Sequence, residues 1–168
     1  LASLAERRGD VREAVLATLA CGRLLSATDP EQAISWYERA LAMDPDLSGA
    51  VQALIGLYRS SGRIPDLLRL QRRYLARATG RRERLRGHLT LGAIYLHQLE
   101  DPLRARAEYE RAVRLDNASL PAWNGLAEAH RVAGDHERER RALERVVALC
   151  DASGDSQALS LARRRVAQ

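Results

Sequence analysis

One helical pattern occurs twice in this chain, and this repetition restricts the fold more than any other feature. Residues 31–46 align with residues 103–118 without a gap, 72 positions further on. Tyr37 then falls on Tyr109, and both begin the same run, Tyr-Glu-Arg-Ala. A chain that repeats an amphipathic helix in this way has the same packing position more than once. The sequence therefore predicts a repetitive arrangement of helices.

Further segments complete the repetition. Residues 66–81 and 138–153 fall in phase with the first pair, and apolar residues recur in each at intervals of three and four. That spacing predicts one buried stripe along each helix. Further apolar segments lie between them, over 51–58, 89–95 and 122–130. Each unit is thus predicted to be helix, turn, helix, with a period of roughly 35 residues.

The turns carry their own signals. Asp-Pro occurs at 29–30 and at 101–102, where Asp is expected to cap a helix and Pro to occupy its first position. Gly62 and Gly134 lie in the corresponding short turns and are predicted to supply helix C-caps. One extra residue in the 101–102 turn predicts a longer connection there.

These repeats resemble the tetratricopeptide repeat, whose signature is W-x2-L-G-x2-Y, then A-x3-F, then P. Leu91, Gly92 and Tyr95 match the first part, as do Trp123 and Leu126. Ala33 and Ala105, each followed four residues later by Tyr, match the second part. The departures are His88 in place of Trp, and Leu67 and Glu139 in place of the small Ala.

The resemblance implies an all-α fold, an α-solenoid of stacked antiparallel helix pairs in a right-handed superhelix. We expect one domain over 1–168, cut from a longer protein because the first residue is Leu1 and not Met. It would hold four repeats, at about 14–47, 48–81, 85–119 and 120–153, with flanking helices at 1–8 and 155–167. The second of these flanking helices is expected to start a further repeat or to act as a solvating cap.

Sequence signals of catalysis are absent. The chain has no phosphate loop, no H-E-x-x-H and no nucleophile elbow. We interpret His88 and His130 as packing residues, and carboxylates such as Glu108 and Glu110 as part of solvated helix faces paired with Arg. The expectation is therefore a protein that is not an enzyme and that needs no cofactor and no metal.

Composition adds the remaining expectations. Cys21 and Cys150 lie in apolar helical patterns and are interpreted as small core residues, with a disulfide between them as the alternative. All 27 basic residues are Arg, a composition typical of a GC-rich bacterial genome. No apolar run reaches the roughly 20 residues of a membrane span, and no signal peptide is visible. A soluble protein is expected, with a cytoplasmic location favoured over a periplasmic one.

The resemblance also implies where a partner binds, because the first helices of such repeats line a concave groove. The predicted groove combines apolar anchors, small residues and charges, which suits an extended or helical peptide of acidic character. The alternative is that neighbouring repeats of the full protein bury the same face. The predicted groove residues are Gln52, Arg59, Leu89, Ala93, Leu96, His97, Asn124, Glu128 and Arg131.

Positive charge is concentrated in the middle of the chain. Residues 59–86 hold ten Arg against Asp66 and Glu83, a net charge of +8, whereas the whole chain has +5. A basic patch of this kind attracts acidic proteins, nucleic acid or anionic lipid, but no aromatic residue is interleaved for base stacking. We interpret it first as a solvated outer face. The patch comprises Arg69, Arg72, Arg73, Arg77, Arg81 and Arg82.

The sequence thus predicts a non-catalytic scaffold that binds a peptide or another protein in its groove. One alternative is a regulatory or spacer segment of a larger enzyme or regulator with no ligand of its own. A second alternative is binding of nucleic acid or an anionic surface through the Arg-rich middle.

Overall fold

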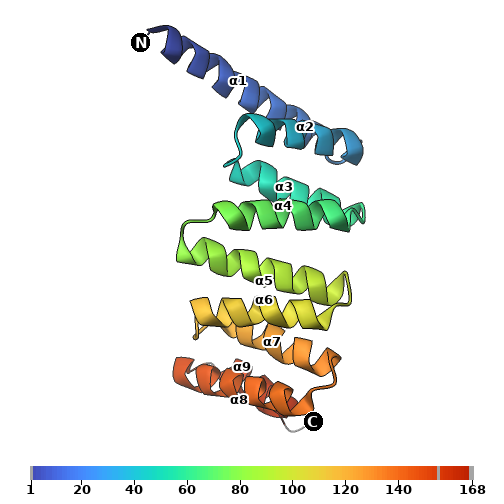
Figure 1. Ribbon diagram of the computed structural model, residues 1–168, viewed down its shortest axis with the longest axis vertical. Coiled ribbons are helices and arrows are strands. Elements are labelled where there is room, and N and C mark those ends of the chain that lie inside the picture. Colours follow the sequence, from blue (N-terminus) through green and yellow to red (C-terminus); the bar gives the residue numbers. More distant parts are fainter. Residues whose placement is uncertain (1, 155, 167–168) are drawn as a thin grey trace. The chain divides into compact units, whose positions relative to one another are not determined.

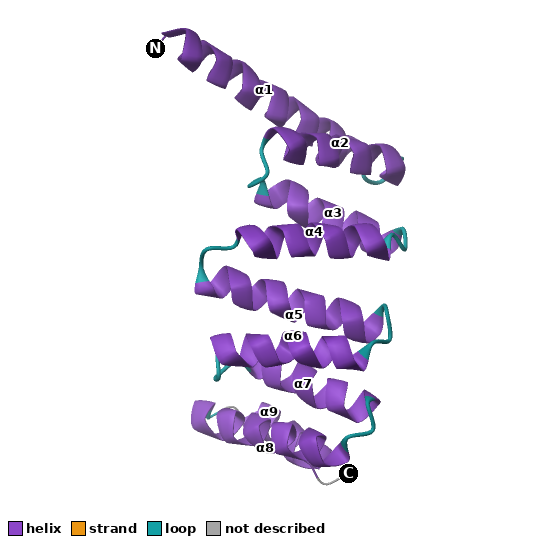
Figure 2. Ribbon diagram, in the orientation of Figure 1, coloured by secondary structure: helices purple, strands orange, loops and turns teal. Residues whose placement is uncertain are grey.

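Helices account for all the regular structure in the computed structural model, which describes residues 2–154 and 156–166 (Figures 1 and 2). The all-α prediction is confirmed. The helices, joined by short turns, are α1 (Ala2–Leu25), α2 (Pro30–Met43), α3 (Ser48–Ser60), α4 (Ile64–Arg77), α5 (Arg81–His97), α6 (Pro102–Leu115), α7 (Leu120–Val132), α8 (His136–Ser153) and α9 (Ser156–Val166).

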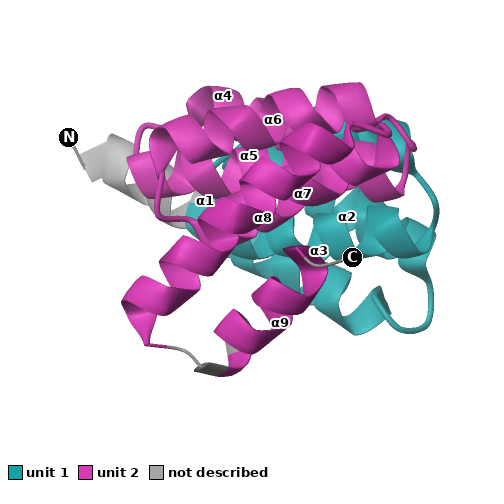
Figure 3. Ribbon diagram, turned by 90° about the horizontal axis from the view of Figure 1, so that it is seen from below, with its two compact units in different colours: residues 1–70 teal, residues 71–168 magenta. Residues whose placement is uncertain are grey.

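The chain divides into two compact units, Leu1–Leu70 and Gln71–Gln168, with the boundary inside α4 (Figure 3). In the first unit α2 packs against α1 and α3. In the second unit each helix from α5 to α9 packs against the next, and α5 also contacts α7. This contact between alternate helices places the first helices of two successive pairs side by side.

The repeated residues form the core of both units. Ala33 and Ala105 are completely buried, and Tyr37 and Tyr109 are 3% and 5% exposed. The small Ala side chain lets the neighbouring helix approach closely, and the Tyr ring fills the space that remains. The prediction that the same helix recurs because the same packing position recurs is therefore confirmed.

Helix ends follow the predicted turn chemistry. The Asp29 carboxylate accepts a hydrogen bond from the Gln32 backbone N–H at 3.0 Å, and Asp101 accepts one from that of Arg104 at 2.9 Å. Gly62 and Gly134 adopt φ values of +67° and +74°, a conformation that costs glycine little. The turn between α5 and α6, residues 98–101, is one residue longer than the turns at 61–63 and 133–135, as predicted. It contains Glu100 at φ +49°.

The predicted beginning of the chain is wrong in one respect. The sequence pattern predicted a flanking helix over 1–8, separate from a first repeat that starts at about 14, but α1 continues without a break from Ala2 to Leu25. A glycine inside a helix costs only about 1 kcal/mol, so Gly9 does not interrupt it. Helix α9 corresponds to the flanking helix predicted at 155–167, of which residues 155 and 167 lie outside the described residues.

Candidate partner-binding surfaces

Helix α3 presents an open polar face in the first unit. Gln52, Gly56 and Arg59 are exposed and lie at positions i, i+4 and i+7, which share one side of a helix. A Cβ atom added at Gly56 would meet no atom within 4 Å. The opposite side, with Leu54 and Tyr58, is buried in the core. Two of the predicted groove residues, Gln52 and Arg59, are thus accessible on one continuous helix face.

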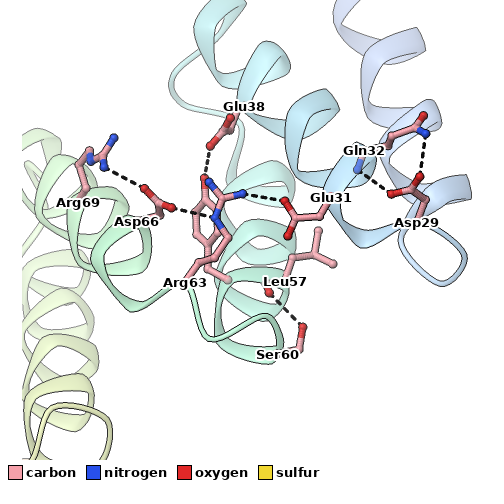
Figure 4. A network of polar contacts seen from close by, with 10 residues as sticks. Asp29, Glu31, Gln32, Glu38, Leu57, Ser60, Arg63, Asp66 and Arg69 are labelled. Atoms are coloured by element: carbon pink, nitrogen blue, oxygen red, sulfur yellow. Dashed lines mark hydrogen bonds and ion pairs between the residues drawn. The ribbon is translucent and has the colours of Figure 1, made fainter.

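A polar network holds α3 in place (Figure 4). Arg63, in the turn after α3, pairs with Glu31 of α2 at 3.1 Å and with Asp66 of α4 at 2.8 Å. Its guanidinium carbon lies 5.3 Å from the centre of the Tyr58 ring, whose hydroxyl donates to Glu38 of α2. Burial, followed by this hydrogen bond, raises the pKa of Tyr58. The phenol therefore remains a donor at neutral pH, and the exposed face of α3 has a rigid support.

In the second unit the predicted groove residues lie on α5 and α7, and their accessibility differs. His97 and Arg131 are exposed, whereas Leu89, Ala93, Asn124 and Glu128 are half-buried. Leu96 is only 4% exposed. It is part of the core, so the expectation that it serves as an apolar anchor for a partner is wrong. The surface is consequently more polar than predicted.

Asn124 is already engaged by the end of the chain. Its Nδ2 donates to the Leu120 carbonyl at 3.1 Å, and its Oδ1 accepts from the Arg165 guanidinium at 2.7 Å. Arg165 belongs to α9 and had not been predicted as part of this surface. The sequence signal for it is the run of three arginines at 163–165. This run lies in the flanking helix that was expected to start a further repeat.

Two glycines hold α6 against α5 and α7. A Cβ atom added at Gly92 would lie 2.8 Å from Cε1 of Tyr109, and one added at Gly125 would lie 2.3 Å from the same atom. Both glycines therefore form a notch that the Tyr109 ring fills. Burial, and then the nearby charge of Glu128, raise the pKa of Tyr109 to about 12. The notch fixes the relative positions of the two helices that carry the predicted groove residues.

A buried polar cluster links α5 and α6 through Glu108, contrary to the solvated face predicted for this carboxylate. Glu108 is 8% exposed. Its carboxylate lies 2.7 Å from Nδ1 of His88 and also pairs with Arg111. Because a carboxylate only accepts, Nδ1 of His88 carries the proton. His88 thus stands where the repeat signature has Trp. It bonds across the helix pair to Glu108, and this contact accounts for the burial of Glu108.

His130, near the end of α7, lacks the hydrogen bond that its counterparts make. Near the end of α3, Tyr58 donates to Glu38 of α2. Near the end of α5, Tyr95 accepts from Arg72 of α4, so both partners lie on the preceding helix. His130 is 5% exposed, and its buried Nδ1 has no hydrogen-bond partner among the described residues. Burial lowers the pKa of His130, an effect that the charge of nearby Asp135 partly offsets. The neutral imidazole is therefore the form that the fold favours.

This lowered pKa predicts a pH dependence of stability. An unfolded histidine binds a proton below its ordinary pKa of 6.5, whereas the folded protein resists it, so stability falls as the pH drops from 6.5 to the lowered value. Urea unfolding between pH 8 and pH 5 should show this loss. A His130→Tyr variant should lose less over the same interval. Equal losses for the two proteins would show that His130 is not the group responsible.

The six arginines of the predicted basic patch are all exposed. In the first unit Arg69 pairs with Asp66 at 2.9 Å. In the second unit Arg72 donates to the Tyr95 hydroxyl, and Arg81 donates to the Leu115 carbonyl at the end of α6. Arg72 and Arg81 therefore also join neighbouring helices, whereas Arg69 and Asp66 belong to the same helix, α4.

Two further observations concern the composition. Cys21 and Cys150 are both free thiols, the first half-buried and the second buried. Within residues 2–154 and 156–166, no helix has both the length and the apolar character needed to cross a membrane.

The comparisons with known proteins agree with this fold. The profile of the tetratricopeptide repeat family matches residues 24–47 and 85–119. Among solved structures, the MamA protein is 18% identical, with a TM-score of 0.64 over 90% of this chain and 82% of that one. A tetratricopeptide repeat protein from Parabacteroides merdae ATCC 43184 is 16% identical, with a TM-score of 0.67 over 90% and 57% of the two chains. The chain is a tetratricopeptide repeat protein, and the resemblance noted in the sequence is confirmed.

A curated relative is similar in sequence as well. Cellulose synthase operon protein C of Xanthomonas axonopodis pv. citri (strain 306) is 32% identical over 165 residues. The alignment covers 83% of this chain, which spans only 10% of the length of that relative. Repeats of this family form protein-interaction modules, and that is the class of protein that the fold defines here.

Proposed function

We propose that this chain is a non-catalytic segment that binds a partner protein or peptide through exposed faces of the first helices of its repeats, on α3 in the first unit and on α5 and α7 in the second unit. The open face of α3 is the observation that supports this most strongly. Gln52, Gly56 and Arg59 leave room for a ligand backbone, and one charge stands beside it. The buried side of the same helix and the network around Arg63 keep this face from adjusting, which lowers the cost of binding.

An exposed arginine in each unit favours a partner with acidic groups. Arg59 is exposed on α3, and Arg131 is exposed on α7 with its guanidinium 3.8 Å from Glu128, a separation that leaves the ion pair loose. Charge-assisted hydrogen bonds from Arg to a carboxylate are about twice as strong as neutral ones. The similarity to cellulose synthase operon protein C suggests the source of the partner. We infer a protein of a cellulose synthase complex as the first candidate.

A charge-reversed variant tests this proposal. Arg59→Glu combined with Arg131→Glu should reduce capture of the partner about tenfold or more, since repulsion replaces a charge-assisted contact. The control is Arg114→Glu combined with Arg140→Glu. It makes the same charge change on α6 and α8, which are the second helices of their repeats. Quantitative pull-down from the source organism, with the cellulose synthase subunits measured individually, gives the readout.

The outcome also separates the second candidate function, a spacer segment with no ligand of its own. That alternative has support because the chain spans only 10% of its relative. If the parent chain and both variants capture the same proteins in equal amounts, the assigned face is wrong. If no protein is enriched by the parent chain, the spacer is the better description.

A further inference from the structure

A pocket of about 540 Å³ lies between α7 and α8 in the second unit. Its apolar lining comes from Trp123 and Leu126 of α7 and from Ala142 of α8. The Trp123 indole N–H donates to the Asn117 carbonyl at 2.9 Å, which fixes the ring in the wall. The pocket is therefore shaped by residues that are held in place.

Three arginines of α8 form one side of this pocket. Arg138, Arg141 and Arg145 all line it, at positions i, i+3 and i+7 of one helix face. Arg138 pairs with Asp135 at 3.0 Å, and Arg141 pairs with Glu137. Arg145 has no ion-pair or hydrogen-bond partner among the residues that the structure describes. Three positive and two negative charges leave the pocket with one unbalanced positive charge.

A buried group without a partner lines the same pocket. The His130 side chain is 6% exposed, and its buried Nδ1 has no hydrogen-bond partner among the described residues. The nearest carboxylate oxygen, Oδ2 of Asp135, is 3.9 Å away, beyond hydrogen-bond distance. An unsatisfied buried polar atom is costly to leave in a folded protein. Because this atom is closed off from solvent, it does not contact a ligand in the pocket, and the neutral imidazole adds no charge to the lining.

We propose that this pocket binds an acidic side chain of a partner protein, with apolar residues on either side of it. The Arg145 guanidinium receives the carboxylate, and the flanking apolar residues cover Trp123 and Leu126. This interaction surface is separate from the face proposed above, because its three arginines stand on α8, the second helix of its repeat.

The charge and the lining favour a carboxylate over other anions. A single unpaired guanidinium matches a single carboxylate, and the bidentate geometry of Arg suits that group. A phosphate monoester carries close to two charges and would have to displace Asp135 or Glu137 from the other two arginines. The apolar lining needs hydrophobic neighbours on the ligand, which a peptide supplies.

The test uses the full chain and two matched peptides, SGLDLGS and its uncharged counterpart SGLNLGS. The chain contains two tryptophans, so the Trp36 indole resonance, from α2 in the first unit, is an internal reference for that of Trp123. The acidic peptide should shift the Trp123 signal and leave that of Trp36 unchanged. The uncharged peptide should bind at least about tenfold more weakly, since a charge-assisted hydrogen bond is lost.

Two variants complete the design. Arg145→Gln should weaken binding of SGLDLGS about tenfold or more, because the unpaired cation is lost. Arg140→Gln removes an exposed Arg of the same helix that pairs with Glu144 outside the pocket and should leave affinity unchanged. Equal weakening by both variants, equal affinity for the two peptides, or no shift of the Trp123 signal at millimolar peptide would overturn the proposal. Tighter binding of a phosphoserine version of the peptide would overturn the assignment of a carboxylate.

Discussion

Replacing Gly125 with Ala is expected to lower the free energy of unfolding of the second unit by about 2 kcal/mol or more. The added Cβ would lie 2.3 Å from Cε1 of the Tyr109 ring. That ring cannot move aside, because the same ring atoms also lie against Gly92 of α5. Relief requires α6 to move away from α5 and α7, which opens the core at the repeated Tyr position.

A matched substitution controls for the change in helix propensity. Gly56→Ala adds the same methyl group within α3, where no atom lies within 4 Å, and should stabilise by up to about 1 kcal/mol. Urea unfolding followed by circular dichroism measures both variants. Since repeat proteins can unfold in steps, hydrogen exchange of α5–α7 should locate the loss in the second unit. A Gly125→Ala variant as stable as the parent would refute the close approach of Tyr109.

Removing the Glu108 carboxylate should have an effect of similar size. Glu108→Ala leaves His88 without its acceptor inside the α5–α6 pair, and a hydrogen bond to a charged group contributes about 1.5–3 kcal/mol. The variant should lose stability within that range. Glu108→Gln keeps an oxygen that can accept from His88 and serves as the conservative control, with a smaller loss.

A double-mutant cycle separates this pair from general effects of burial. His88→Trp restores the residue typical of the repeat signature, and together with Glu108→Ala it replaces the charged contact by an apolar one. The combined loss should be clearly smaller than the sum of the two single losses. Each single variant leaves one buried partner unpaired, whereas the double variant leaves none. Additive losses would mean that His88 and Glu108 do not depend on each other.

The fold could be predicted because its signals are local and repeated. The Tyr37 and Tyr109 positions, the small Ala residues before them and the Asp-Pro turns each read the same way in more than one copy. The extra residue between α5 and α6 even predicted where a connection is longer. Agreement between copies removed the ambiguity that a single amphipathic stretch leaves.

The parts that could not be predicted depend on contacts between helices. Glu108 looks like any charge on a solvated helix, and only the position of His88 on α5 explains its burial. Leu96 was assigned to the groove from its spacing, yet its side chain faces the core. Gly125 had a visible signal, since a glycine inside a helix usually has a packing reason. The α7–α8 pocket combines residues from two helices, which no spacing within one segment reveals.

The packing of Tyr109 between alternate helices is the contact on which the repeat architecture depends most directly. Nuclear Overhauser effects between the Tyr109 ring protons and the Hα protons of Gly92 and Gly125 measure it in solution. The stacked arrangement predicts both effects, together with ring resonances shifted by the surrounding core. Ring protons at random-coil positions with neither contact would contradict it, and the surfaces assigned to α5 and α7 would lose their basis.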